Sequence, residues 1–378
     1  MYFLTQQDPN YTIKGSRDPL GFQVLWQAAG RKLIPHLSTV SGSIIDFQII
    51  SLAFYLKKEF NISDEEFNSF FIKLEQLMAY SRFKLNEEAG FNGIDKVRKT
   101  LQSGGSTVKI SNAEQILSNQ RAYGIWGKYN RPFTDMQLKE NEEFDAIYKS
   151  KIENNTEFLN QIKALIKKGD TDTALVSIEK LSLFTSLINK PTDKEKELFI
   201  NKILQDNCDD ELLKIFSSNQ DLINLGGYEL FEKISSNSNN QKLKAEINHI
   251  VNTEKVLSPL NRIFRLLQTQ SFWSKEQIDT NENISKWRTN VDSSVLDSTT
   301  KELSTLLQKS NWELVSGLVK RNEEVSNLRN SAPWVRFTTN GIEVNHFEGA
   351  GAWEYNPESE MDNSYFLYTY ISLFKQLN

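Results

Sequence analysis

Nearly half of the chain, from Lys149 to about Asn330, is a series of amphipathic segments whose apolar residues recur at helical spacing. Short polar links separate the segments, and one such break is predicted between residues 253 and 257. The whole chain of 378 residues contains only 17 glycines and 8 prolines, and this scarcity of helix breakers favours a mainly α-helical fold. The series shows no fixed repeat of about 30–45 residues, which predicts an irregular multi-helix bundle over 151–330 rather than a regular solenoid.

The first predicted helix begins at Asp18. Its carboxylate can accept hydrogen bonds from the amides of the first turn, and Pro19 needs no amide hydrogen at that position. Gly30 is a predicted helix end, because glycine readily adopts the left-handed conformation that closes many helices. Pro35 disfavours helix at the residue before it, so we expect a second helix from about 41 to 58.

Arg31 and Lys32 follow Gly30 near the carboxyl end of the first predicted helix. The helix dipole favours cations at that end, so the only role of both side chains could be to stabilise the helix. The alternative is contact with a phosphate group or with another protein, and we keep Arg31 and Lys32 as candidate partner-binding residues.

The window 96–139 carries eight basic and two acidic residues, a net charge of +6 in a chain of net charge −5. Tyr123, Trp126 and Tyr129 are spaced three apart, so on a helix they would share one face. Glycines beside these aromatic residues indicate either two closely packed elements or a stacking surface that contacts nucleic acid. The candidate nucleic-acid-binding residues in this window are Arg98, Lys99, Arg121, Tyr123, Trp126, Lys128 and Arg131.

Residues 63–150 loosely suggest a winged-helix-like unit. A helix opened by a capping box at Ser63 is followed by a basic helix near 94–101, a Gly-Gly turn and a short strand at 107–110. A second capping box at Ser111 predicts a further helix. This suggestion rests only on the order of the predicted helices and strand, since no residue in the segment forms a diagnostic motif.

The last part of the chain predicts a β-hairpin followed by an aromatic helix. Alternating residues flank Asn340-Gly341, a pair that favours a type I′ turn, and the apolar segment 363–374 is typical of a docked helix. We expect this tail to pack on the N-terminal domain. The predicted domains are 1–150, 151–330 and 331–378.

No motif in the chain predicts a catalytic residue, a metal site or a cofactor. Cys208 is the only cysteine and there are three scattered histidines, so no zinc-binding spacing is present. The phosphate-binding, metalloprotease and nucleophile-elbow motifs are also missing from the sequence. The apolar run from Ile44 to Leu56 is too short and too polar to span a bilayer, and the amino terminus does not resemble a signal peptide. We therefore expect a soluble, cytoplasmic protein with no membrane contact.

Three stretches, residues 16–41, 123–133 and 362–373, together resemble a group of uncharacterised bacterial proteins. That group is associated with multigene operons in defence islands against phage and plasmids. The resemblance covers about a fifth of the chain and carries no established catalytic residues. It implies an accessory or scaffold subunit that acts beside an ATPase or nuclease from the same operon.

The leading hypothesis is therefore a non-enzymatic interaction subunit of a bacterial complex, with possible nucleic-acid contact through residues 96–139. The first alternative is a DNA-binding transcriptional regulator that uses a winged-helix-like module. The second alternative is a cryptic hydrolase or nuclease that would depend on a metal and on acidic clusters such as Asp64-Glu65-Glu66 and Asp209-Asp210-Glu211.

Overall fold

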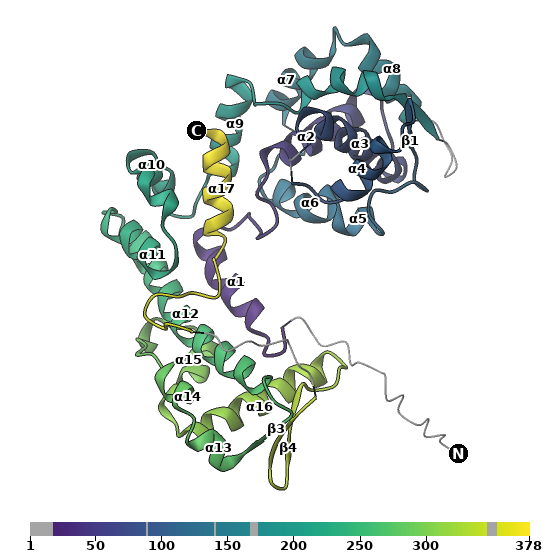
Figure 1. The fold of residues 1–378 in the computed structure, drawn as a ribbon. Coiled ribbons are helices and arrows are strands. Elements are labelled where there is room, and N and C mark those ends of the chain that lie inside the picture. Colours follow the sequence, from purple (N-terminus) through teal and green to yellow (C-terminus); the bar gives the residue numbers. More distant parts are fainter. Residues whose placement is uncertain (1–17, 88–89, 140, 167–172, 346–353) are drawn as a thin grey trace, which may run out of the picture. The chain divides into compact units, whose positions relative to one another are not determined.

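The computed structural model describes residues 18–87, 90–139, 141–166, 173–345 and 354–378, and these residues form a mainly α-helical structure (Figure 1). The chain divides into two compact units. Unit 1 combines residues up to Pro35 with 206–365, and unit 2 combines 36–205 with 366–378. This division groups the chain differently from the predicted domain boundaries at 150 and 330, because each unit joins segments that are distant in the sequence.

Unit 1 is built around one long helix, α12 (Gln241–Leu267), against which α1, α11, α15 and α16 pack. The helices of unit 1 are α1 (Phe22–Leu33), α10 (Glu211–Ser218), α11 (Gly227–Ser236), α12, α13 (Lys275–Asp279), α14 (Glu282–Lys286), α15 (Ser298–Ser304) and α16 (Asn311–Leu328). Short 3₁₀ segments lie at Gln220–Asn224, Ser293–Val295 and Thr305–Gln308.

Helix α12 corrects the predicted break between 253 and 257, since it continues through Pro259. A proline inside a helix removes one backbone hydrogen bond and costs about 3 kcal/mol. The residues around it, including Val256, Leu260 and Phe264, are fully buried. Each such side chain contributes about 1.5–3 kcal/mol on burial, so packing on several sides outweighs the proline.

Helix α1 begins and ends later than predicted. The Asp18 carboxylate does accept from the amides of the first turn, at 2.8 Å from Phe22 N and 3.2 Å from Gln23 N. The helix itself starts at Phe22, after Gly21 in a left-handed conformation. Gly30 lies buried within the helix, and the extended residue before Pro35 ends it, as the proline predicts.

The C-terminal hairpin is confirmed, with strands β4 (Val335–Thr338) and β5 (Gly341–Val344). Strand β3 (Phe272–Ser274) pairs with the other edge of β5 and gives a three-stranded antiparallel sheet in the order β3-β5-β4. The type I′ turn is not formed: Thr338 pairs with Gly341, so Thr339 and Asn340 form the loop, and neither has a positive φ. Gly341 instead allows β5 to lie close to β3, because a Cβ atom on Gly341 would lie 2.2 Å from the Trp273 carbonyl oxygen.

Unit 2 is built around α3 (Asp64–Leu85), which is buried along most of its length from Phe67 to Phe83. Its capping box is formed as predicted, with Ser63 and Glu66 each accepting from the other's backbone amide. The other helices of unit 2 are α2 (Ile44–Glu59), α4 (Ile94–Gln102), α5 (Gln120–Tyr123), α6 (Ile125–Asp135), α7 (Glu142–Ile152), α8 (Thr156–Leu165), α9 (Asp193–Ile203), α17 (Leu367–Leu377) and the 3₁₀ segment Ile178–Leu187.

Two other predictions in unit 2 need correction. The helix predicted after Ser111 is absent: Ser111 Oγ accepts from the Glu114 amide, but only turns follow until α5. The C-terminal helix starts at Leu367 rather than 363, since Tyr365 and Phe366 have positive φ values of 50° and 67°. Helix α17 packs on α9 and α2, and its Gln376 accepts from the Ile44 amide at 2.9 Å.

Strand β1 (Thr107–Ile110) pairs antiparallel with β2 (Ala174–Ser177), which lies outside the segment 63–150. Among the described residues, no helix combines the length and hydrophobicity needed to cross a bilayer.

Candidate partner-binding site

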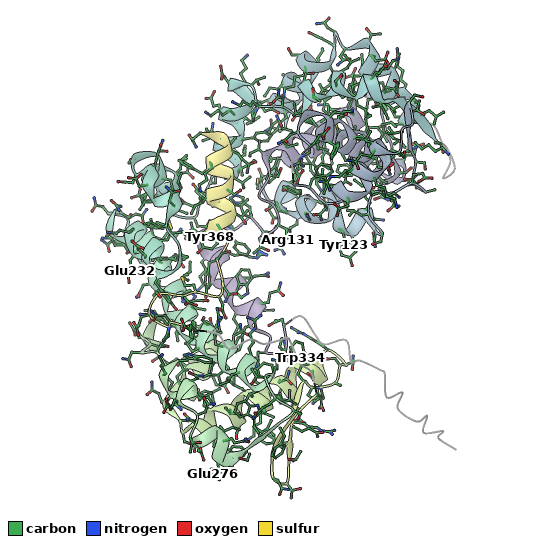
Figure 2. The ribbon with its side chains drawn as sticks, in the orientation of Figure 1. Tyr123, Arg131, Glu232, Glu276, Trp334 and Tyr368 are labelled. Carbon is green, nitrogen blue, oxygen red and sulfur yellow. The ribbon has the colours of Figure 1, made fainter. Side chains whose placement is uncertain are left out.

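The residues predicted to form one basic, aromatic face are distributed over three helices of unit 2. On α4, Lys99 is exposed, whereas Arg98 pairs with Asp95 at 3.0 Å and lies 5.9 Å over the Phe83 ring. On α5, Arg121 is exposed. On α6, Arg131 is exposed and lies 3.5 Å from Asp135 (Figure 2).

Tyr123, Trp126 and Tyr129 do not share a helix face, because Gly124 is extended and separates α5 from α6. Tyr123 is 56% exposed on α5. Tyr129 is buried, and its hydroxyl accepts from the Ser43 amide at 3.0 Å. Trp126 is half-buried against other aromatic rings.

The two glycines in this segment serve close packing, one of the two interpretations that the sequence left open. A Cβ on Gly124 would lie 2.5 Å from Glu75 Oε1, and a Cβ on Gly127 would lie 1.9 Å from the Ala122 carbonyl oxygen. Both distances are far below van der Waals contact. The glycines therefore allow α6 to begin directly against α3 and the end of α5.

Trp126 forms the floor of a wide hollow on unit 2 together with Phe54 of α2 and Phe67 of α3. The Trp126 ring lies 6.2 Å from Phe54 and 5.8 Å from Phe67, measured between centroids. The hollow has a volume of about 870 Å³, within the range of ligand and peptide sites in proteins. We call this feature the aromatic hollow.

Charged side chains of both signs surround the aromatic hollow. Lys57 pairs with Asp64, and its hydrogen bond lowers the pKa of that carboxyl. Lys58 pairs with Asp145 at 2.5 Å. Lys139 lies 5.6 Å over the Phe54 ring, a cation–π contact. With Glu142, the charged lining comprises three lysines and three carboxylates, so its formal charge is zero.

Lys128 lies in a separate polar pocket formed by α2, α3 and α6. Arg82 pairs with Asp46 at 2.8 Å, and both side chains are nearly buried. Glu75 accepts from the Ile125 amide at 2.7 Å and from Gln120 Nε2 at 2.9 Å.

Burial has the largest effect on the pKa values of the ionisable side chains in this polar pocket. It raises the pKa of Glu75 to about 7 and raises the pKa of Asp46. It lowers the pKa of Lys128, against the opposing effect of the Asp46 and Glu75 charges. The space left in the pocket is about 30 Å³, and one water molecule needs about 10–15 Å³. These groups therefore hold α6 against α3 and leave no room for a larger ligand.

The candidate partner residues Arg31 and Lys32 lie in unit 1, at the end of α1. Lys32 Nζ is 3.2 Å from His249 Nε2, and His249 Nδ1 is 2.8 Å from the Val295 carbonyl oxygen. Since a carbonyl only accepts, Nδ1 carries the proton and Nε2 accepts from Lys32. Arg31 is half-buried, so Lys32 is the more exposed of the two.

In the part of the chain that the structure describes, no three His, Cys, Asp or Glu side chains come together as metal ligands. Cys208 is buried, and burial raises the pKa of its thiol to about 11, with Asp206 adding to the effect. Such a thiol is a weak nucleophile at neutral pH. Comparison with protein-family models, curated proteins and solved structures finds no match to this chain.

Sequence reasoning missed most of the aromatic hollow. The sequence makes Trp126 a candidate nucleic-acid-binding residue, whereas nothing in the sequence marks Phe67 as part of a binding site. Phe54 lies near the end of the apolar run Ile44–Leu56, where helical spacing alone indicates burial, and Lys57 and Lys58 follow that run directly. The sequence changes from apolar to basic residues at the end of that run. This change is the signal that could have indicated the charged rim of the aromatic hollow.

Proposed function

We propose that this chain is a non-enzymatic interaction subunit of a bacterial multiprotein complex, and that it binds a segment of a partner protein in the aromatic hollow. The hollow itself carries the proposal: it is large, its floor is aromatic and its rim is charged. Protein interfaces have this anatomy, with aromatic anchors at the centre and a polar rim. The proposed role in defence against phage or plasmids rests on the three resembling stretches alone.

The charge around the hollow favours a polypeptide over a nucleic acid. A phosphate backbone would meet the carboxylates of Asp64, Glu142 and Asp145, and the lysines opposite are partly engaged. A peptide can place one aromatic or aliphatic side chain on the floor and offer residues of both charges to the rim. The occupant we propose is such a mixed-charge peptide segment with an apolar anchor.

Nucleic-acid contact through residues 96–139 has less support. Lys128 is engaged within unit 2, and Arg98 and Arg131 have acidic neighbours. Lys99 and Arg121 are the exposed cations that this alternative would rely on. A winged-helix-like regulator stays a prediction, and the pairing of β1 with a strand outside 63–150 weighs against it. No observation favours the hydrolase alternative.

Selection from a random peptide phage library against the full chain tests the proposal. We expect enriched peptides to share an aromatic or aliphatic anchor between charged residues. Synthetic versions should bind W126L about tenfold or more weakly, because central anchors commonly contribute over 1 kcal/mol. They should also bind K139E more weakly, because that change reverses a charge at the rim. The matched control is Y123L, which removes an exposed aromatic ring from the neighbouring helix but lies outside the hollow.

Circular dichroism would verify that each variant is folded. Equal binding of the peptides to the protein and to W126L, or a selection that enriches no shared anchor, would overturn the proposal. A DNA duplex of random sequence serves as the competing probe. If it binds in a salt-dependent manner that R121E abolishes, while no peptide binds, the nucleic-acid alternative takes the lead.

A further inference from the structure

The last segment of unit 1, residues 354–365, contains no helix or strand and lies against α12 (Figure 1). We call these residues the strap. In the sequence the strap leads directly to Phe366 and α17, which belong to unit 2. The α12 side chains that bond to the strap recur at helical spacing, so one face of α12 holds it. They are Glu254, Ser258, Asn261 and Arg262.

Glu254 makes the largest number of these bonds. It is fully buried, and its carboxylate accepts four hydrogen bonds from the strap. Oε1 accepts from the backbone amides of Asp362 and Asn363, the latter at 3.0 Å. Oε2 accepts from Asn363 Nδ2 at 2.9 Å and from the Tyr365 hydroxyl at 2.7 Å. Two carboxylate oxygens have about four acceptor positions, so this arrangement uses all of them.

Other contacts attach the strap at both of its ends. The Asp362 carboxylate pairs with Arg262 at 2.6 Å and accepts from Asn261 Nδ2 at 2.7 Å. The Tyr355 hydroxyl donates to Ser258 Oγ at 3.1 Å. These bonds use polar and charged groups on both sides, so the strap is held by hydrogen bonds along its length.

The ionisable groups around Glu254 come from α11, from the strap and from α12 itself, whereas α1 contributes the uncharged Trp26 ring, 6.1 Å from the Tyr365 ring. They are Tyr228 of α11, Tyr355, Asp362 and Tyr365 of the strap, and Lys255 and Arg262 of α12. Burial raises the pKa values of the three tyrosines above their ordinary value of 10, so they stay neutral near pH 7. In the described part of the chain, no lysine, arginine or histidine forms an ion pair with Glu254.

A proton on Glu254 is therefore compatible with the closed strap. Burial raises the pKa of Glu254 to about 7, against the hydrogen bonds from Asn363 and Tyr365, which lower it. The acid form keeps the contact with Tyr365, because a hydroxyl can accept a hydrogen bond as well as donate one. When the strap opens, water surrounds the carboxyl group and its pKa falls towards the ordinary value. The closed strap thus binds a proton more tightly than the open strap.

We propose that the strap is a pH-dependent clasp, which the proton on Glu254 favours in the closed form and which opens more readily as pH rises from about 5 to 7. Loss of one proton raises the ratio of open to closed strap by up to about tenfold per pH unit. Tyr365 favours opening too, since its φ of 50° is a left-handed conformation that an aromatic residue rarely adopts. Opening detaches from α12 the segment that leads to α17.

Amide hydrogen exchange of the full chain, resolved to single residues by NMR, tests this proposal. The amides of Asp362 and Asn363 donate to Glu254, so they exchange when the strap opens. After correction for the chemical exchange rate, their protection should fall by up to about tenfold per pH unit between about pH 5 and 7. The control is the Asp292 amide, which donates at 2.8 Å to Asn252 Oδ1, a neutral acceptor on the same helix. Its protection should not change with pH.

Three variants make the test specific. E254Q should remove the pH dependence at Asp362 and Asn363, because glutamine does not titrate. E246Q makes the same change at a half-buried glutamate earlier on α12 and should retain that dependence. Y365F removes one bond from both forms of Glu254, so it should lower the protection at every pH and keep the slope.

The proposal fails if the protection of Asp362 and Asn363 is constant or increases with pH, or if E254Q keeps the slope. It also fails if Asp292 loses protection in parallel, since the opening would then involve more than the strap. If E254Q does not fold, Y365F decides, and unchanged protection in that variant would refute the clasp. Because the strap belongs to unit 1, failure here leaves the peptide proposal for unit 2 unaffected.

Discussion

Replacing Gly124 by alanine should destabilise unit 2, although the backbone at this position would accept alanine freely. Gly124 has φ −82° and ψ −165°, an ordinary extended conformation. On backbone grounds alone, Gly→Ala at such a site stabilises a protein by about 0.4–1 kcal/mol, because the unfolded chain loses freedom. The contacts of the added Cβ predict the opposite sign.

The added Cβ would lie 2.5 Å from Glu75 Oε1 and 2.4 Å from the Gln120 carbonyl oxygen. Glu75 is buried and holds the first amide of α6, Ile125 N. Moving it away costs the helix cap, about 1 kcal/mol, and leaves a buried group unsatisfied at about 1–3 kcal/mol. After subtraction of the backbone gain, we expect a net loss of about 1–3 kcal/mol.

Urea unfolding measures this loss. Trp126 is the only tryptophan in unit 2, so its 5-fluorotryptophan resonance reports on the unit that carries the change. The matched control is G105A, where the new Cβ would meet only the Thr107 carbonyl oxygen at 3.5 Å, an ordinary contact. That variant should be unchanged or slightly more stable. If G124A is as stable as the unmodified protein, the argument from Glu75 is refuted.

The remaining predictions concern buried ionisable groups. Burial raises the pKa values of Glu75 and Glu254 from 4.5 to about 7, so the folded state binds protons more tightly than the unfolded chain. These two groups therefore stabilise the folded state most below about pH 4.5, and their contribution to the free energy of unfolding falls as pH rises towards 7, by about 1.4 kcal/mol per pH unit for each group. E254Q should reduce that slope in urea titrations at several pH values. R82M should lower the free energy of unfolding by about 3–5 kcal/mol in the same assay, because it leaves Asp46 as an unpaired buried charge. Adding D46N to R82M should recover part of that loss. Cys208 should react with a thiol reagent at neutral pH only as fast as the protein unfolds, and rapid labelling of the native chain would contradict its burial.

Local chemistry accounts for the features that the sequence predicted correctly. The capping box at Ser63 needs two side chains three residues apart, and the hairpin at 335–344 needs two alternating segments with a short link. The mainly α-helical class follows in the same way, because helical periodicity and the scarcity of glycine and proline act over a few turns of chain. These interactions join residues that are already neighbours.

Local signals also failed where packing was stronger. Pro259 should interrupt a helix, and Gly30 should end one, yet both lie inside helices whose surroundings are buried. The burial that outweighs these local preferences comes from residues far away in the sequence. Periodicity within one segment contains no information about which other segment will cover it.

The sequence by itself determined the helical class, several helix ends and the hairpin, because each depends on residues within a few positions of one another. Only the tertiary structure decided that Glu75 meets Gly124, that Trp126 forms a hollow with Phe54, and that Trp26 shares a cavity with Asn261. Such pairings depend on closing loops of tens to hundreds of residues. Their stability comes from the shape and charge of surfaces that exist only once the helices have packed.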